Sequence, residues 1–216
     1  MKKLLIVLFS GVLAAPLGLV WATPVTNSTG LAAPISTITF DEHVYAPFTD
    51  ITDQYLPEGV TFTPLVSYDY QFCGSFPGIQ GHCVGSFGQT AYSIHFTTPQ
   101  SGAAFAIATN PTTTTFTAKL NGAVVESYQS ATDNSQPSIS FQGFEGIEFD
   151  EIEISVAGPV NNRGSVIDNI QMAGPPSPPP VPGNSVAVPV NPVWAIATLI
   201  LLVMSSGFVA VNRRKR

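Results

Sequence analysis

Short runs of β-forming residues, broken by turn residues at intervals of roughly ten positions, most strongly limit how this chain can fold. In the clearest run, Ile152, Ile154 and Val156 alternate with Glu153 and Ser155. A period of two puts the apolar side chains on one face of a strand and the polar ones in solvent. Between residues 23 and 173 no stretch has the period of a helix. The pattern therefore predicts an all-β domain.

The expected strands lie between positions 36 and 173, which we take as one domain after an N-terminal extension, residues 23–35. They are Thr37–Phe40, Val60–Pro64, Ala91–Phe96, Ala103–Thr109, Thr114–Leu120, Ala123–Tyr128, Ser138–Gln142, Ile147–Val156 and Ser165–Met172. Asn121-Gly122 is typical of a tight hairpin turn. Many short strands without helices favour an antiparallel β-sandwich.

The composition changes after the last strand, where residues 174–187 are rich in proline. Such a run cannot continue a sheet or a helix, so we expect an extended spacer of the polyproline type. A ligand for a proline-reading domain is the alternative interpretation.

The N-terminus has the pattern of a secretory signal peptide. Lys2 and Lys3 precede the apolar run Leu4–Ala14, and small residues flank Trp21 in Val20–Ala22. We expect residues 1–22 to form a signal helix that the Sec export machinery reads and signal peptidase removes after Ala22. An uncleaved N-terminal helix is the alternative.

The C-terminus predicts a membrane span. Val193–Val211 carries no charge over 19 residues and as a helix would be about 28 Å long, close to the hydrocarbon thickness of a bilayer. Four cations follow, namely Arg213, Arg214, Lys215 and Arg216. Such a cluster holds its end of a helix in the cytoplasm, so the preceding chain should lie outside. A buried helix of a soluble domain is the alternative.

A proline motif precedes this span, with Val188, Pro189 and Pro192 ahead of Trp194. Motif, helix and basic end together resemble the C-terminal sorting signals of Gram-negative bacteria known as PEP-CTERM and IPTL-CTERM. The resemblance covers residues 188–216 and leaves the subtype open. It implies an inner-membrane intermediate, processing by an exosortase-like enzyme, and a final location at the cell surface or outside the cell, often beside exopolysaccharide.

Charge is distributed unevenly along the chain. Between residues 23 and 191 there are two cations, Lys119 and Arg163, against fourteen acidic residues, which gives a net charge of −12. This charge would repel phosphate backbones, so nucleic acid is excluded as a partner. It would attract divalent cations, although solubility alone also explains an acidic surface.

The chain has two cysteines, Cys73 and Cys83, at the ends of a glycine-rich segment. In an exported protein such a pair predicts a disulfide. A metal site with the neighbouring His82 is the alternative, but two cysteines and one histidine are too few for a closed zinc site.

Short motifs near both ends of the domain resemble the ectodomains of many PEP-CTERM proteins. Examples are Ile38–Glu42, Phe149–Ile152 and Ile167–Ile170. The resemblance implies a jelly-roll sandwich related to galactose-binding-like and carbohydrate-binding modules. It also implies a structural Ca²⁺ held by Asp41 or Glu42 together with Asp168, since calcium prefers carboxylate oxygens. The alternative is that these acids are ordinary turn or strand-end residues.

Aromatic residues crowd around the cysteine loop, including Tyr68, Tyr70 and Phe76. Their rings could stack on sugars and form a ligand patch. They could equally form a small core beneath the loop, and the sequence favours that interpretation.

The sequence contains no catalytic motif of a known hydrolase or metalloprotease. Acidic pairs such as Asp150-Glu151 lie in or beside an alternating strand, where outward charges are usual. We therefore expect no enzyme. The predicted function is that of an exported surface or matrix protein with a structural or adhesive role, and the alternative is a carbohydrate-binding module with a structural calcium site and a polysaccharide partner.

Overall fold

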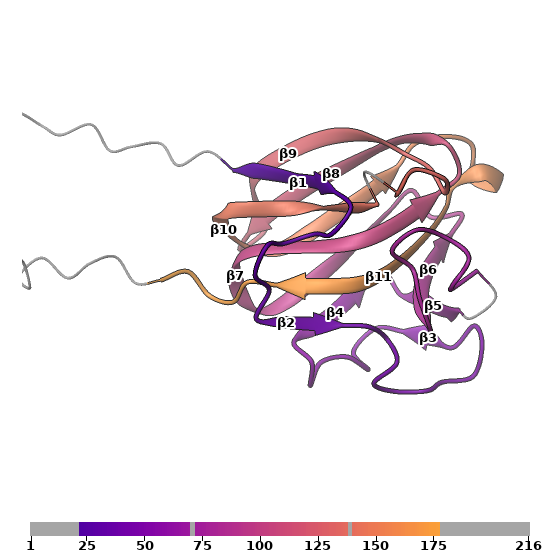
Figure 1. Ribbon diagram of the computed structural model, residues 1–216, viewed down its shortest axis with the longest axis horizontal. Helices are drawn as coiled ribbons and strands as arrows, with labels where there is room; N and C mark the ends of the chain where they lie inside the picture. Colours follow the sequence, from indigo (N-terminus) through magenta and orange to yellow (C-terminus); the bar gives the residue numbers. More distant parts are fainter. Residues whose placement is uncertain (1–21, 70–71, 138–139, 178–216) are drawn as a thin grey trace, which may run out of the picture. The chain divides into compact units, whose positions relative to one another are not determined.

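The computed structural model describes residues 22–69, 72–137 and 140–177, which fold mainly into antiparallel strands joined by loops (Figure 1). A short 3-10 turn, Val160–Asn162, precedes the last strand. The prediction of an all-β domain is confirmed. The strands are β1 (Thr23–Asn27), β2 (Ser36–Ile38), β3 (Asp50–Ile51), β4 (Val60–Thr63), β5 (Val66–Asp69), β6 (Cys83–Phe87), β7 (Ala91–Thr109), β8 (Thr112–Leu120), β9 (Ala123–Thr132), β10 (Phe141–Val156) and β11 (Gly164–Met172).

Two long strands, β7 and β10, each contribute to both layers of a β-sandwich. The first half of β7 pairs with β4 and with the second half of β10, which in turn pairs with β8. The second half of β7 pairs with β11 and with the first half of β10, which also pairs with β1. The register between β7 and β10 shifts between Glu145 and Glu151. Bulges of this kind let a strand bend from one layer into the other.

The main core lies between the two layers. It contains the alternating residues Ile152, Ile154 and Val156 of β10, which are at most 3% exposed, as their period predicts. In the second half of β7, Phe105 and its neighbours at odd positions enter this core. Ala104, Ala106 and Ala108 enter a second, smaller cluster with Val25, Leu31 and Ile79. The small alanine side chains let the covering loops approach β7 closely.

Three local features can be compared directly with the sequence. Asn121 and Gly122 both have positive φ in the turn that joins β8 to β9, which confirms the predicted hairpin. The separate strands expected at Ala91–Phe96 and Ala103–Thr109 are halves of one bent strand. Within the predicted N-terminal extension 23–35, Thr23–Asn27 forms a strand that pairs with β10. Its proline at position 24 suits an edge strand and hides the usual strand pattern.

The start of β1 and the end of β11 lie at one end of the sandwich, and the start of β11 lies at the other. Thr23 pairs with Glu145, Glu145 with Gly102, and Met172 with Ala103, so β1 begins where β11 ends. Figure 1 shows these two points on the same side. At the other end of β11, Gly164 pairs with Phe87 and Ser165 with Thr109. The seven steps from Ser165 to Met172 separate the two ends by about 23 Å.

The predicted targeting segments lie outside the described residues. These include the signal peptide, most of the proline-rich spacer, the motif residues Val188, Pro189, Pro192 and Trp194, the span 193–211, and the cluster Arg213–Arg216. Among the residues that the structure describes, no helix is long and apolar enough to span a bilayer.

Candidate functional site

A groove of about 430 Å³ opens at the end of the sandwich where β6 and β7 finish and β11 begins. This volume falls in the range typical of small-ligand sites. The lining comes from the cysteine loop, the turn after β6, the end of β7, the loop after β9 and the loop before β11. The lining residues are Phe72, Phe76, Phe87, Gly88, Ala108, Thr109, Asn110, Asn134, Val160, Asn161, Arg163, Gly164, Ser165 and Val166. None of them is acidic.

Aromatic and aliphatic side chains form the apolar part of the groove. The rings of Phe72 and Phe87 lie 6.1 Å apart and are 45% and 46% exposed, and Val160 is 64% exposed. Phe76 is half-buried and packs against the smaller core cluster. A soluble domain rarely gathers several exposed apolar side chains in one hollow without a function.

Amide side chains supply the polar part. Asn110, Asn134 and Asn161 are exposed at the lining, and Asn110 donates from Nδ2 to the carbonyl oxygen of Asn162 at 3.2 Å. The hydroxyls of Thr109 and Ser165 are buried and bonded within the protein. The exposed amides therefore offer the side-chain donors and acceptors that a hydroxyl-rich ligand would meet.

A disulfide fixes the loop that carries Phe72 and Phe76. Cys73 and Cys83 are bonded, with their Cα atoms 5.7 Å apart, so the predicted disulfide is confirmed. Two further contacts hold the loop to the domain. Ile79 is 1% exposed in the smaller core cluster, and Asn169 donates from Nδ2 to the carbonyl oxygen of Gly78 at 2.8 Å. The loop is thereby pinned to β11.

Asp168 forms another anchor of the same loop. Its Oδ2 accepts the backbone N–H of Gln80 at 2.8 Å, and its Oδ1 accepts the N–H of Asn169 at 2.6 Å. The carboxyl group is fully buried. Burial raises the pKa of Asp168 to about 7, against the lowering effect of these hydrogen bonds, and the nearby acids Asp41 and Glu42 raise it further.

Tyr68 and Phe76 of the predicted ligand patch, which also includes Tyr70, do not lie together on one surface. Tyr68 is 1% exposed, and its hydroxyl donates to the backbone carbonyl of His43 at 3.1 Å, so this ring belongs to the core and cannot stack on a sugar. Tyr70 lies outside the described residues. Phe76 does line the groove. Tyr68 thus belongs to the main core, whereas Phe76 packs partly against the smaller cluster beside the cysteine loop and partly lines the groove.

Sequence reasoning did not identify Val160, Arg163 and the three asparagines as site residues. They come from loops far apart along the chain. One signal was available, because Arg163 is one of only two cations outside the targeting segments. It stands in a polar loop directly before β11.

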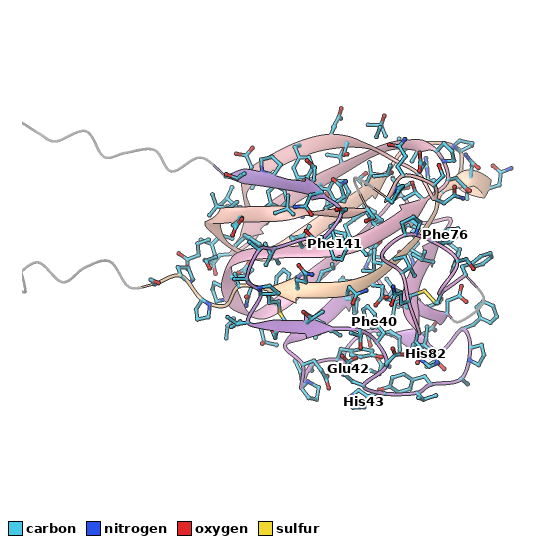
Figure 2. All side chains as sticks on the ribbon, in the orientation of Figure 1. Phe40, Glu42, His43, Phe76, His82 and Phe141 are labelled. Atoms are coloured by element: carbon cyan, nitrogen blue, oxygen red, sulfur yellow. A yellow bond between two sulfur atoms is a disulfide. The ribbon has the colours of Figure 1, made fainter. Side chains whose placement is uncertain are left out.

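The predicted calcium ligands do come near one another, on either side of the segment Gln80–His82. Asp41 accepts the N–H of His82 at 3.0 Å and also contacts its ring nitrogen, while Asp168 accepts the N–H of Gln80. Figure 2 shows Glu42 and His82 on the same side of the domain as His43. Within the described ranges, no group of three or more His, Cys, Asp or Glu side chains could hold a metal. The calcium site stays a prediction.

Lys119 forms ion pairs with two acidic residues of β10, Glu151 and Glu153. Its Nζ contacts Oε1 of Glu151 at 3.0 Å and Oε2 of Glu153 at 2.8 Å. Burial pushes the pKa of Glu151 upward, but hydrogen bonds from Ser93 and Lys119 outweigh this and lower the pKa below its ordinary value. A carboxyl group held ionised in this way is suited to stabilising a strand pair rather than to donating a proton.

Comparison with protein-family models finds no family that matches this chain, and comparison with curated proteins finds no matching sequence.

Proposed function

We propose that this chain is an exported, non-enzymatic protein of the bacterial surface or extracellular matrix, with a structural or adhesive role. Its C-terminal segment acts as a sorting signal of the PEP-CTERM or IPTL-CTERM kind, handled by an exosortase-like enzyme. The observation that carries the proposal is the Cys73–Cys83 disulfide, which belongs to an oxidising compartment. The patterns at residues 1–22 and 188–216 agree with that compartment.

Expression of the full chain in a Gram-negative host that encodes an exosortase tests this proposal. We expect the mature protein to begin at Thr23 and to accumulate at the surface or in the medium. Deletion of residues 188–216 should leave it soluble in the periplasm. N-terminal sequencing and cell fractionation measure both results. A mature protein that still begins at Met1, or equal fractionation with and without the tail, contradicts the proposal.

The groove favours a second, more specific candidate, which is carbohydrate binding. Exposed rings beside amide side chains are the combination that sugar sites use, because rings stack on the apolar face of a pyranose and amides bond its hydroxyls. The position of the groove supports the same interpretation, since it lies at the end of β11 opposite Gly174, where the proline-rich spacer begins. If the domain binds carbohydrate, we propose that its β-sandwich has the jelly-roll topology of galactose-binding-like modules.

A glycan-binding measurement with a matched variant tests the second candidate. We expect the double variant Phe72→Ala/Phe87→Ala to lose at least about tenfold in affinity, because fully burying a phenylalanine side chain contributes roughly 1.5–3 kcal/mol. Phe48→Ala is the control, since Phe48 is 54% exposed and does not line the groove. Equal binding by the double variant and the control would exclude the groove as the sugar site.

A further inference from the structure

The groove contains a positive charge, which is rare in this acidic domain. Its only charged lining residue is Arg163, in a domain whose other described ionic side chains are mostly acidic. Of the two cations in the described residues, Lys119 is held between Glu151 and Glu153. Arg163 forms no ion pair with any carboxylate in the part of the chain that the structure describes. The groove is therefore lined by a cation that no carboxylate of the described residues neutralises.

The guanidinium of Arg163 is held in place by neutral partners. Its Nε donates to the carbonyl oxygen of Gly158, and its Nη1 donates to Oγ1 of Thr90 at 2.9 Å. The backbone carbonyl of Arg163 accepts the N–H of Gly88 at 2.8 Å. These contacts orient the group without neutralising its charge. An arginine fixed in this way needs little ordering to bind an anion, and its planar fork matches a carboxylate.

We infer that the groove recognises a carboxylate-bearing sugar, a uronic acid unit of an acidic polysaccharide, with Arg163 as the partner of the carboxylate. This inference rests on the carbohydrate-binding candidate above and adds the charge of its ligand. The rings of Phe72 and Phe87 face the sugar ring, and the exposed amides of the lining meet its hydroxyls. The volume of about 430 Å³ suits a short segment of the polymer.

The acidic surface of the domain repels an anionic ligand, whereas Arg163 attracts it, so the sizes of this repulsion and this attraction must be compared. At physiological ionic strength, charges separated by more than about 8 Å are largely screened. The nearest charge to a ligand in the groove is Arg163, because no lining residue is acidic. A hydrogen bond between an arginine and a carboxylate is about twice as strong as one between neutral groups. Asp133 precedes the lining residue Asn134, and its carboxylate accepts the backbone N–H groups of Ser135 and Gln136. We therefore expect the attraction of Arg163 to exceed the repulsion from the acidic surface.

Calorimetric titration at physiological salt tests the inference. The probes are short oligomers of glucuronate, galacturonate and mannuronate, each beside its neutral sugar counterpart. We expect at least one uronate to bind about tenfold or more tightly than its counterpart. In Arg163→Gln this preference should disappear, and Arg163→Lys should keep part of it. Lys119→Gln removes the same charge outside the groove and should keep all of it, and circular dichroism melting verifies that each variant is folded.

The outcomes separate the two proposals. If neutral and acidic oligomers bind equally, or Arg163→Gln keeps the preference, the role of Arg163 is wrong, although loss of binding in Phe72→Ala/Phe87→Ala would still support a sugar site. If no uronate binds, the inference is overturned. If no oligomer of either kind binds and the glycan screen is also negative, carbohydrate binding itself is excluded.

Discussion

We expect the free energy of unfolding of this domain to fall by about 3 kcal/mol between about pH 5 and about pH 8 because of Asp168 alone. The pKa of this carboxyl is raised from 3.8 to about 7 by burial. Between these values the folded state keeps a proton that the unfolded state has released. Raising the pH in this window therefore favours the unfolded state, and the loss is nearly complete at about pH 8, one unit above the folded-state pKa.

Asp168→Asn isolates this effect. The amide cannot ionise, so the variant should lack the share of the pH dependence that comes from this position. Its oxygen can replace only part of the acceptor capacity that Gln80 and Asn169 use, so a constant loss of stability is expected at every pH. Urea unfolding at several pH values measures both effects. Because the histidine–carboxylate pairs, such as His43 with Glu58, are common to both proteins, they cancel in the difference. Parallel curves for the two proteins contradict the expectation.

The same pair of proteins tests the predicted calcium site. A cation beside Asp168 would favour its ionised form, so millimolar calcium should raise the melting midpoint at about pH 8 in the natural protein and not in Asp168→Asn. A midpoint that calcium and chelator leave unchanged would exclude calcium binding by Asp41, Glu42 and Asp168.

Local features of the chain were the predictable ones. The alternation of Ile152, Ile154 and Val156 with polar residues specifies one buried face whatever the rest of the fold does. Asn121-Gly122 can adopt positive φ at both positions, which a two-residue hairpin needs. With two cysteines in the chain, an intramolecular disulfide has only one possible partner choice. The strand and the hairpin each depend on a few adjacent residues, and the disulfide follows because the chain has no third cysteine.

Features that depend on the path of the backbone were not predictable. The segment around Pro99 and Gly102 looks like a break between strands, yet β7 runs through it, because bending into the second layer keeps its pairing with β10. Tyr68 and Phe87 both belong to aromatic-rich runs, but one ring is 1% exposed and the other 46%. Composition cannot distinguish them, since the layer above each strand decides which rings it covers.

The residues of the candidate groove could not be predicted from the sequence for the same reason. Phe72, Phe87 and Arg163 are separated by up to 91 positions in the sequence, and they meet because β6 and β11 pair with Phe87 opposite Gly164. No local pattern contains that register. The scarcity of cations in an acidic domain is the sequence signal that could have identified Arg163.

We expect loss of the disulfide to destabilise the domain by about 3 kcal/mol, since the bond between Cys73 and Cys83 restricts the unfolded chain, although so short a loop gives less than a long one would. For a domain of this size such a loss lowers the melting midpoint by roughly 6–12 °C. The variant is Cys73→Ala/Cys83→Ala, because Cys83 is fully buried and alanine leaves no unpaired hydroxyl there. Calorimetric melting measures the shift.

Reductant provides the matched control for this prediction. It should lower the midpoint of the natural protein toward that of the double variant and leave the variant unchanged, whereas a shift in both would indicate an effect unrelated to the disulfide. Equal midpoints for the two oxidised proteins would contradict a stabilising role. Ile79, Asp168 and Asn169 still hold the far part of the loop after reduction, while Phe72 and Phe76 lie next to the lost bond. Ligand binding in the groove should therefore weaken even at temperatures where the variant remains fully folded.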